Sequence, residues 1–503
     1  MKTIGELLKF RSEVHPNRKA LFYEGKELTY LELFNLARKA GEYLKSLSLK
    51  KGDRFGVLDF NSEISQHILN GASLIGAIPI FINWRLTPSE IKIILEDSNT
   101  KILLYGEEFF ETINSLSSFN CNNISIIDLD KFNSIQEEIY YIKEDDVYVQ
   151  LYTSGTTGLP KGVPLTHKHM LAVLRNLATE LPGFGADSIN LVCAPFFHIG
   201  GVGYSNLGFF IGGENILVNK FDPVLVNRLI GERKITNALL VPAMIGAILN
   251  LADVEKTDYS NLRNIQFGGS PMPIDLLKKA NSIFKCKFTQ AYGLTETSGI
   301  ASLLRYDEQI LGLKENTEQK YIKRLASVGK PSPKMEIVIK LDNERKANTN
   351  ELGEICIKGD YVFSGYWNRK DLNLDIFDKE GWFHTGDIGL IDEEGFIYIV
   401  DRKNDMILSK SENIYPVEIE RALEGHPLLK DFAVVGTSDE EYGEIVTLFA
   451  IPAVNKDIKI EDIKIYLKDK LASYKIPRKI FIVNEIPRNP TGKVLRKELK
   501  RKV

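Results

Sequence analysis

The sequence predicts a multidomain α/β protein, and three observations support this class. As far as about Gly353, apolar helical patterns alternate with short runs rich in β-branched and aromatic residues, which is typical of helices packed on largely parallel sheets. The chain has 503 residues, which is too long for one ordinary core, so two or more domains are expected. The pattern then changes twice, after Gly353 and again near Asp401.

The N-terminal segment, residues 1–16, predicts an amphipathic helix, and residues 28–47 predict a longer one. Between the helical patterns lie short apolar runs whose composition and length are those of buried strands. These predicted strands fall in residues 54–60, 101–106, 123–129, 189–196, 215–221, 236–242 and 264–269.

After Gly353 the chain becomes a series of short strands separated by glycines, in residues 353–359 and 388–405, which predicts β-hairpins or a small β-barrel-like region. The final hundred residues return to an α+β rhythm and predict a separate small C-terminal domain. Its expected helices lie in residues 415–426 and 460–474, and its expected strands in residues 431–439, 447–453 and 479–486.

Composition excludes several classes of protein. The formal net charge is −3, from 64 basic and 67 acidic residues, so no nucleic-acid partner is expected. The longest apolar run, residues 71–82, is too short to cross a bilayer, and the N-terminus lacks the apolar core of a signal peptide, so we expect a cytoplasmic protein without a transmembrane segment. Widely spaced cysteines without metal-ligand spacing predict reduced, mostly buried thiols at Cys121, Cys193, Cys286 and Cys356.

The segment "VQLYTSGTTGLPKGVPLTH", residues 149–167, predicts a loop between a strand and a helix. Its glycines let the backbone approach a ligand, its hydroxyls and N–H groups can donate hydrogen bonds, and Lys161 supplies charge, so the loop suits a polyphosphate. It is not a Walker A loop, because Lys161 follows a proline and precedes Gly162. A plainer interpretation is a surface turn rich in serine and threonine.

The string "YTSGTTGLPKGV" resembles the signature of the adenylate-forming superfamily, which contains acyl-CoA synthetases, luciferases and the adenylation domains of peptide synthetases. Five more motifs follow in the family's order, and the resemblance extends from Leu28 to Leu499. It implies a large N-terminal domain, a small mobile C-terminal domain, and a loop that covers the ATP β- and γ-phosphates. By resemblance, the phosphate-binding residues are Thr153, Ser154, Gly155, Thr156, Thr157 and Lys161.

Two motifs resemble the family's adenine site. "FGGSPMP", residues 267–273, resembles the turn that lies against adenine, and "QAYGLTET", residues 290–297, resembles the segment whose aromatic ring stacks on it. The resemblance implies that Thr295 contacts the α-phosphate and that Glu296 holds Mg²⁺. The other implied ATP-binding residues here are Gly268, Gly269, Ser270, Pro271, Gln290, Ala291, Tyr292 and Gly293.

Three further residues complete the implied site. Asp387, at the end of "GWFHTGD", resembles the carboxylate that binds both ribose hydroxyls, and Arg402 in "IVDRKND" lies near the ribose and at the interdomain hinge. Lys493 in "PRNPTGKVLRKEL" occupies the place of the family's adenylation lysine. Each has a plainer interpretation: a turn residue for Asp387, a structural ion pair for Arg402, an exposed hairpin lysine for Lys493, and a helix N-terminal charge for Glu296. Because six motifs occur in the family's order, we favour the functional interpretation of each of these residues.

The chemistry explains these residue types. A carboxylate is a poor acylating agent, and attack on the ATP α-phosphate converts it to an acyl adenylate with a good leaving group. Two anions must meet, so fixed positive charge is needed. Lys493 can bridge the carboxylate and the α-phosphate, and one carboxylate such as Glu296 is sufficient for Mg²⁺, which retains waters.

The spelling of two motifs, "APFFHIGG" and "GWFHTGD", resembles that of acid–CoA ligases. "APFFHIGG", residues 194–201, resembles the form in which an aromatic residue and His198 gate the acyl pocket, although a lone histidine is commonly a packed core residue. No arginine or lysine occurs in the segments expected around the acid, so we expect a monocarboxylic, largely apolar substrate: a fatty acid first, an aryl or arylpropenoic acid second. The implied acyl-pocket residues are His198, Gly201, Val202, Gly269, Gly293 and Leu294.

Glycines recur in residues 198–213, where a helix is expected despite a cost of about 1 kcal/mol for each glycine. Gly200, Gly201, Gly203 and Gly208 either allow close helix packing or leave room for an acyl chain.

The implied coenzyme A tunnel contains Lys410, Ser411, Glu412 and Asn413. Ser411 stands where the family commonly has glycine, so an acyl-AMP ligase that passes the acyl group to a carrier protein is a second hypothesis. The family separates its two half-reactions by rotating the C-terminal domain. We therefore expect domains at residues 1–400 and 406–503 joined by a hinge at 401–405, with ATP, Mg²⁺ and CoA as cofactor and co-substrates and a homodimer as one possible assembly. The motifs are also compatible with a non-catalytic nucleotide-binding protein and with a luciferase-like oxygenase.

Overall fold

The computed structural model forms two compact units. The first comprises Met1–Leu325, Pro331–Glu336 and Lys358–Phe383, and the second comprises Ala326–Lys330, Ile337–Ile357 and His384–Val503. The structure describes residues 1–116, 122–125, 141–153, 160–341, 345–403, 405–409, 412–439, 442–454, 456–468, 470–488 and 492–503, without the side chains of residues 122–125, 412 and 413.

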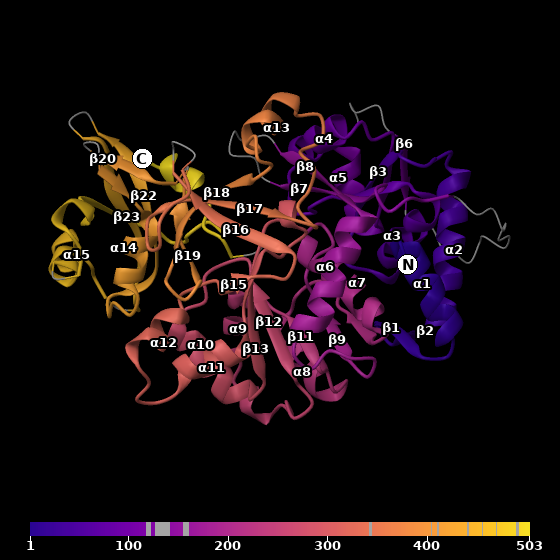
Figure 1. Ribbon diagram of the computed structural model, residues 1–503, viewed down its shortest axis with the longest axis horizontal. Helices are drawn as coiled ribbons and strands as arrows, with labels where there is room; N and C mark the ends of the chain where they lie inside the picture. Colours follow the sequence, from indigo (N-terminus) through magenta and orange to yellow (C-terminus); the bar gives the residue numbers. More distant parts are fainter. Residues whose placement is uncertain are drawn as a thin grey trace. The chain divides into compact units, whose positions relative to one another are not determined.

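A largely parallel sheet dominates the first unit, as the sequence predicts (Figure 1). Its strands follow the order β14-β13-β12-β11-β9-β10-β1-β2. All neighbours from β13 to β1 are parallel, whereas β14 and β2 pair antiparallel at the two ends. The strands are β1 (Lys19–Tyr23), β2 (Lys26–Thr29), β9 (Ile189–Val192), β10 (Glu214–Leu217), β11 (Asn237–Leu239), β12 (Asn264–Gly268), β13 (Lys287–Tyr292) and β14 (Ser302–Leu304), and the two-residue β15 (Lys330–Pro331) follows in the sheet order.

A second, all-parallel sheet has the order β4-β3-β5-β6, and β7 and β8 form a separate antiparallel pair. The predicted strand in residues 123–129 corresponds to β6, and residues 126–129 lie outside the described part of the chain. The bounds are β3 (Arg54–Leu58), β4 (Ile78–Phe81), β5 (Ile102–Tyr105), β6 (Asn122–Ser125), β7 (Val147–Thr153) and β8 (Lys161–Thr166).

Several helices of the first unit begin at side-chain caps that the sequence encodes locally. Thr29 and Glu32 form a capping box that starts α2, and Thr87 and Glu90 form another that starts α4. The helices are α1 (Ile4–Val14), α2 (Tyr30–Ser46), α3 (Glu63–Ile75), α4 (Pro88–Asp97), α5 (Phe110–Asn114), α6 (His167–Glu180), α7 (Ile199–Ile211), α8 (Pro223–Glu232), α9 (Pro242–Leu249), α10 (Ile274–Phe284), α11 (Tyr306–Leu313), α12 (Gln319–Arg324) and α13 (Lys370–Ile376).

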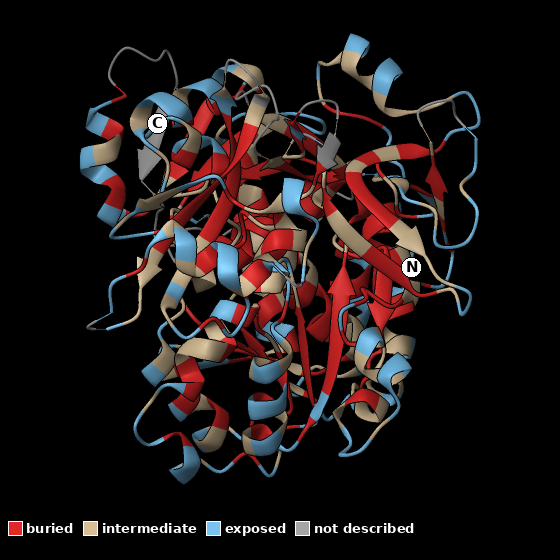
Figure 2. Cartoon of the chain, turned by 90° about the vertical axis from the view of Figure 1, so that its left-hand side faces the viewer, coloured by how far each residue is buried: buried red, intermediate tan, exposed pale blue. Residues whose placement is uncertain are grey.

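The core of the first unit lies between its main sheet and the helices that cover it. Strands are mostly buried, whereas the outer faces of helices are exposed (Figure 2). Phe267 on β12 and Phe288 on β13 are fully buried beside Phe284 of α10. Burial of apolar area at about 25 cal/mol per Å² holds these layers together, and it fixes the carboxyl ends of β12 and β13 side by side.

The second unit contains the glycine-rich strands and the C-terminal α+β region that the sequence predicts. The former pair in the linear order β16-β17-β18-β19, and β18 and β19 form a hairpin, which agrees with the hairpin alternative of the sequence prediction. The latter pair in the order β21-β20-β23-β22, with β24 parallel to β23. The bounds are β16 (Met335–Lys340), β17 (Gly353–Gly359), β18 (Phe383–Ile391), β19 (Ile397–Arg402), β20 (Ile407–Ser409), β21 (Glu412–Ile414), β22 (Leu429–Asp439), β23 (Gly443–Pro452), β24 (Lys479–Ile482), α14 (Pro416–Leu423), α15 (Ile460–Leu467) and α16 (Arg496–Lys500).

Two predictions from composition can be compared with the structure. Cys193, Cys286 and Cys356 are buried and are in no disulfide among the described residues, as expected, and Cys121 lies outside those residues. Among the described residues, none of the helices combines the length and the apolar character that a membrane span requires.

Candidate active site

The two motifs that resemble an adenine site lie next to each other at the carboxyl ends of β12 and β13. Gly268 pairs in register with Ala291, and a Cβ added at Gly268 would lie 2.2 Å from the Ala291 carbonyl oxygen. Only glycine allows this approach. Gly269 has φ +78° and begins a turn that continues through Ser270 and the exposed Pro271. Ligands of open α/β sheets bind at this edge, where strands end.

The strand β13 carries Gln290, Ala291 and Tyr292 to the same edge, and all three are buried. The following turn is tight, because a Cβ at Gly293 would lie 2.3 Å from the Gly299 carbonyl oxygen. The Leu294 N–H donates to the Thr297 hydroxyl at 2.9 Å, which starts a short 3-10 helix, η4 (Thr295–Thr297). The chain therefore turns directly from the predicted stacking residue into the predicted α-phosphate and metal residues.

Glu296 is 5% exposed, and its Oε1 accepts a hydrogen bond from the Tyr366 hydroxyl at 2.7 Å. Its other oxygen, Oε2, has no partner among the described residues. The structure, over those same residues, contains no group of three or more metal-ligating side chains. One partly committed carboxylate fits Mg²⁺, which takes few protein ligands and keeps its waters, better than it fits a metal that needs a complete protein cage.

The phosphate loop corrects one prediction. Thr153 ends β7 and Lys161 begins β8, and the two residues face each other in the antiparallel pair, so the loop joins two strands rather than a strand and a helix. Pro164 lies within β8, at an edge position that tolerates the missing N–H, and the helix begins only at His167. Ser154, Gly155, Thr156 and Thr157 lie outside the described residues.

Both described residues of this loop have features that suit a ligand. The Thr153 hydroxyl is buried and has no hydrogen-bond partner among the residues that the structure describes, which is costly unless another group supplies one. The Lys161 ammonium lies 4.2 Å from the centre of the Tyr366 ring. The strand behind it is held by the Trp367 N–H, which donates to the Gly162 carbonyl at 2.8 Å.

His198 precedes α7, and its ring lies 4.6 Å from that of Phe197. Burial, with a smaller effect of the Arg85 charge, lowers the pKa of His198 to about 4, so the imidazole is neutral at physiological pH. Its Nε2 is buried without a partner. A neutral ring with an uncommitted nitrogen can line a pocket and contact a polar substrate atom.

The glycines of α7 separate into two groups. A Cβ would lie 2.2 Å from the Pro195 carbonyl oxygen at Gly201 and 1.9 Å from the Asn215 side chain at Gly208, so close packing explains both, and Gly200 is tight against Leu239. Gly203 differs, because nothing lies within 4 Å of a Cβ added there.

The motif that carries His198 meets the motif that carries Glu296. Gly299, which ends the turn after η4, would place a Cβ 3.2 Å from a side-chain carbon of Ile199, the first residue of α7. The neighbouring Val202 is fully buried, and Leu294 and Thr295 are partly exposed. The predicted acyl motif and the predicted nucleotide motif therefore lie in contact within the first unit.

In the second unit, three predicted residues, Asp387, Arg402 and Lys493, lie near one another. This carboxylate is 3% exposed, and the Arg402 guanidinium contacts it at 2.5 Å across the β18–β19 hairpin. Burial, together with the nearby Arg402 charge, lowers the pKa of Lys493, while Asp387 and Asp405 act in the opposite direction. The lysine thus lies within electrostatic reach of the predicted ribose carboxylate, and Arg402 forms the ion pair that the plainer interpretation expected.

A second carboxylate fixes the turn that carries Asp387. Glu354, at the start of β17, accepts from the Gly386 N–H at 2.9 Å, from His384 at 3.2 Å and from the Lys403 ammonium at 3.2 Å. Gly386 has φ +74°, a conformation that favours glycine. These donors lower the pKa of Glu354, although burial acts against them, so the group is an anion that anchors both sides of the hairpin.

Of the implied coenzyme A tunnel, Glu412 and Asn413 begin β21, which pairs with β20. Their side chains, and the whole of Lys410 and Ser411, lie outside the described residues.

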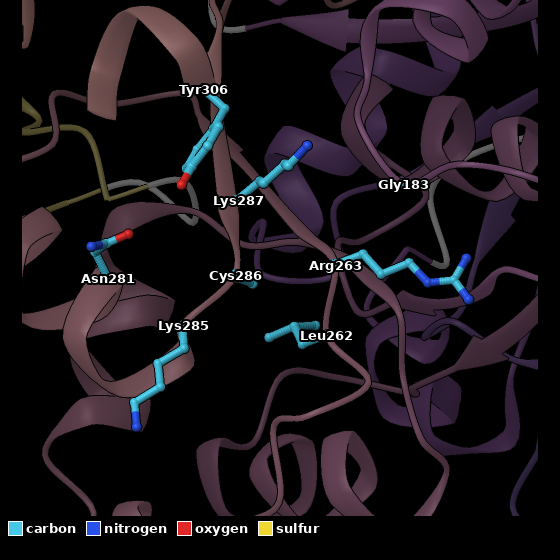
Figure 3. Close-up of a pocket in the computed structure, with 8 residues that line it drawn as sticks. All are labelled: Gly183, Leu262, Arg263, Asn281, Lys285, Cys286, Lys287 and Tyr306. Atoms are coloured by element: carbon cyan, nitrogen blue, oxygen red, sulfur yellow. The ribbon is translucent and has the colours of Figure 1, made fainter. Parts of the chain in front are cut away.

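A surface pocket of about 640 Å³ lies at the amino ends of β12 and β13, opposite the motifs (Figure 3). None of the predicted site residues lines it, and its Arg263 is already paired with Asp187 at 2.6 Å. The chemistry expected from the motifs therefore does not lie there. The lining residues are Gly183, Leu262, Arg263, Asn281, Lys285, Cys286, Lys287 and Tyr306.

Sequence reasoning did not identify Tyr366, Glu354 or Arg85. Tyr366 and Glu354 lie far along the chain from the residues that they contact, and Arg85 lies far along it from His198, so no local spacing could indicate these relations. The nearest signals were the position of Glu354 at the start of a predicted strand and the aromatic pair formed by Tyr366 and Trp367.

Comparison with known proteins agrees with the motifs. The family model described as AMP-binding enzyme matches residues 8–367, and the model described as AMP-binding enzyme C-terminal domain matches residues 418–493. These matches confirm the resemblance.

Three similar proteins are named as ligases or synthetases that differ in their acid or in their acceptor. Fatty acid–acyl-carrier-protein ligase ScoC of Streptomyces coeruleorubidus is 34% identical, covering 99% of this chain and 96% of that protein. Long-chain-fatty-acid–CoA ligase FadD13 of Mycobacterium tuberculosis is 32% identical, with coverage of 99% and 98%. The structure of O-succinylbenzoate coenzyme A synthetase (MenE) from Bacillus subtilis with ATP and magnesium ion has a TM-score of 0.87, 31% identity, and coverage of 98% and 99%.

Proposed function

The chain belongs to the AMP-binding enzyme family, and from that premise we propose that it is an ATP-dependent acid–thiol ligase of the acyl-CoA synthetase type. In the first half-reaction a carboxylate oxygen attacks the α-phosphorus of ATP, the bond to the bridging β-phosphate oxygen breaks, and pyrophosphate leaves. In the second, a thiol sulfur attacks the acyl carbon, AMP leaves, and the thiol proton passes to solvent.

The observation that carries this proposal is the meeting of two motifs at one place. Adenylation requires an acid and an α-phosphate to come together, and the His198 segment and the Glu296 segment touch through Ile199 and Gly299. Orphaned polar atoms at both sides, the Thr153 hydroxyl and the His198 Nε2, are what a site for polar substrates would leave unsatisfied.

In this proposal, different residues bind different parts of the nucleotide. Tyr292 and the turn after Gly268 hold the base, Thr153 and Lys161 hold phosphates, and Asp387 holds the ribose. Lys493 offsets the repulsion between the two reacting anions, and its lowered pKa reflects the burial that strengthens such an interaction. Magnesium bound through Glu296 supplies charge neutralisation on phosphate oxygens.

The preferred substrate is a largely apolar monocarboxylic acid, with a fatty acid first. Two observations support it: the apolar surroundings of His198 and the fatty-acid names of two similar proteins. The acceptor is coenzyme A or the thiol of a carrier protein. Similarity to FadD13 supports coenzyme A, and similarity to ScoC supports a carrier protein. The assay below compares the two acceptors.

A second candidate substrate is an aryl acid with an additional carboxylate. Arg85 favours it, because this exposed guanidinium lies 3.9 Å from the Trp84 ring centre, 5.9 Å from that of Phe197, and close enough to His198 to lower its pKa. A cation on aromatic faces beside the predicted acyl gate could receive a second anionic group. The 2-succinylbenzoate–CoA ligase of Oceanobacillus iheyensis, 33% identical, has a substrate of that kind in its name.

The test is a panel of acids with ATP and Mg²⁺, followed by pyrophosphate release. Fatty acids of increasing length, aryl monoacids and aryl diacids are compared, and thioester formation is measured separately with CoA and with a phosphopantetheinylated carrier. Arg85→Leu should reduce activity only with diacids if the second candidate is right. No pyrophosphate from any acid would refute the proposed function.

Lys493→Ala tests the division between half-reactions and the proposed domain rotation about residues 401–405. Pyrophosphate formation should fall by at least about a thousandfold, because one fixed charge at the reacting anions is lost, while thioester formation from supplied acyl adenylate continues. Lys479→Ala, an exposed lysine of the same unit, is the matched control and should change neither rate. Equal loss of both half-reactions in Lys493→Ala contradicts the assignment.

A further inference from the structure

One tyrosine outside every predicted motif connects residues from two of them. The Tyr366 hydroxyl donates to Glu296 Oε1 at 2.7 Å, and the Lys161 ammonium lies 4.2 Å from the centre of the same ring. The side chain is 6% exposed. A single buried ring therefore contacts the predicted metal carboxylate at its edge and the predicted phosphate lysine on its face.

The backbone around Tyr366 is tied to both partners. The Phe363 N–H donates to the Glu296 carbonyl at 2.8 Å, and the Trp367 N–H donates to the Gly162 carbonyl at 2.8 Å. Asn373 completes the arrangement, since its side chain accepts from the Tyr366 N–H at 2.7 Å and donates to the Tyr366 carbonyl at 2.9 Å. The position of the ring is thus set by main-chain contacts on each side and does not depend on a ligand.

The two contacts of the ring differ in kind. A hydroxyl bonded to a carboxylate is a strong, directional hydrogen bond that fixes the rotation of the carboxyl group. An ammonium over an aromatic face is attracted by the ring quadrupole. The first contact commits Oε1 of Glu296 and leaves Oε2, and the second holds the Lys161 ammonium at the face of the ring.

We propose that Tyr366 is a positioning residue that sets the orientation of Glu296 and the place of Lys161 together, so that the metal ion and the terminal phosphates of ATP are bound as one unit. This inference rests on the proposed function for the identity of the ligands. Tyr366 contacts neither ligand; it acts through the two charged side chains.

Three variants separate the two contacts. Tyr366→Phe removes the hydroxyl and keeps the ring, whereas Tyr366→Leu removes both. Tyr361→Phe is the matched control, because Tyr361 is also buried and its hydroxyl bonds to the Pro333 carbonyl and to Asn176, away from both charges. The measurements are the Mg²⁺ concentration for half-maximal pyrophosphate release, KM for ATP, and calorimetric binding of ATP at several Mg²⁺ concentrations.

Tyr366→Phe should raise the half-maximal Mg²⁺ concentration about tenfold, the value expected from one hydrogen bond to a charged group, with a smaller change in KM for ATP at saturating Mg²⁺. Tyr366→Leu should raise both the half-maximal Mg²⁺ concentration and KM for ATP. In a Glu296→Gln background, Tyr366→Phe should add little, because the two changes affect one interaction. Tyr361→Phe should shift neither quantity by more than about twofold.

An unchanged Mg²⁺ requirement in Tyr366→Phe, an equal shift in Tyr361→Phe, or full additivity with Glu296→Gln overturns the inference. Calorimetry distinguishes this failure from failure of the proposed function. If no acid yields pyrophosphate but ATP binding still depends on Mg²⁺ through Tyr366, the positioning role stands and the acid–thiol ligase proposal falls. If wild-type enzyme activates acids and Tyr366→Phe matches it, only the positioning role is refuted.

Discussion

Replacing Glu354 with glutamine tests how the ribose carboxylate is held. The wild-type side chain is 13% exposed and accepts from three donors: His384 and the Gly386 N–H, both in β18 just before Asp387, and Lys403, which follows the end of β19. Glutamine has the same shape but one oxygen in place of two, and its NH₂ group is a donor. Whichever way the amide points, either the Gly386 N–H or the Lys403 ammonium then faces another donor.

The free energy lost in Glu354→Gln can be estimated from these contacts. Hydrogen bonds to charged groups contribute about 1.5–3 kcal/mol each, and at least one is lost. A change of 1.4 kcal/mol corresponds to a tenfold change in affinity, so if the whole of this free energy were lost from nucleotide binding, the affinity for ATP would fall about 10- to 100-fold. Asp387 itself is unchanged, so the expected effect is a rise in KM for ATP within that range, with a smaller change in kcat.

The assay is pyrophosphate release at a saturating acid, with ATP varied, alongside the thermal midpoint of each protein. Glu351→Gln is the control, because Glu351 lies on the same segment but forms an exposed ion pair with Arg345, of the kind that contributes little to stability. It should change KM for ATP less than twofold. The reasoning fails if Glu354→Gln leaves KM for ATP unchanged, or if kcat alone falls.

Two further predictions concern pH and substrate length. Burial raises the pKa of Asp401 to about 6, so the folded state binds its proton more tightly than the unfolded state does, and this group loses stabilisation as pH rises from about 4 to about 6. Relative to Asp401→Asn, wild-type protein should therefore lose about 1 kcal/mol of unfolding free energy between pH 5 and pH 7, measured by denaturant titration; a constant difference refutes the shift. Gly203→Leu, at the one α7 glycine with open space around its Cβ, should lower kcat/KM for a long fatty acid at least about tenfold and spare a short one. An equal effect on both lengths would place Gly203 outside the acyl path.

The sequence determined the fold class, the order of elements and the family. Periodicity reports local geometry, so the alternation of helices and strands correctly predicted a largely parallel sheet, and the helix in residues 28–47 corresponds to α2. Motif order identified the family because six separate strings occur in sequence.

Local patterns failed where two segments had to be considered together. Residues 149–167 predicted a loop that leads from a strand to a helix, yet the strand β8 (Lys161–Thr166) follows the loop, because pairing with β7 supplies hydrogen bonds that the local pattern cannot indicate. The contacts of Tyr366 with Glu296 and of Glu354 with Lys403 likewise join residues far apart in the chain. Such contacts depend on how sheets, turns and helices pack to bury apolar area, and that packing is decided by the chain as a whole. Residue types and their order are written in the sequence; the partners that orient a catalytic charge are fixed only in the folded molecule.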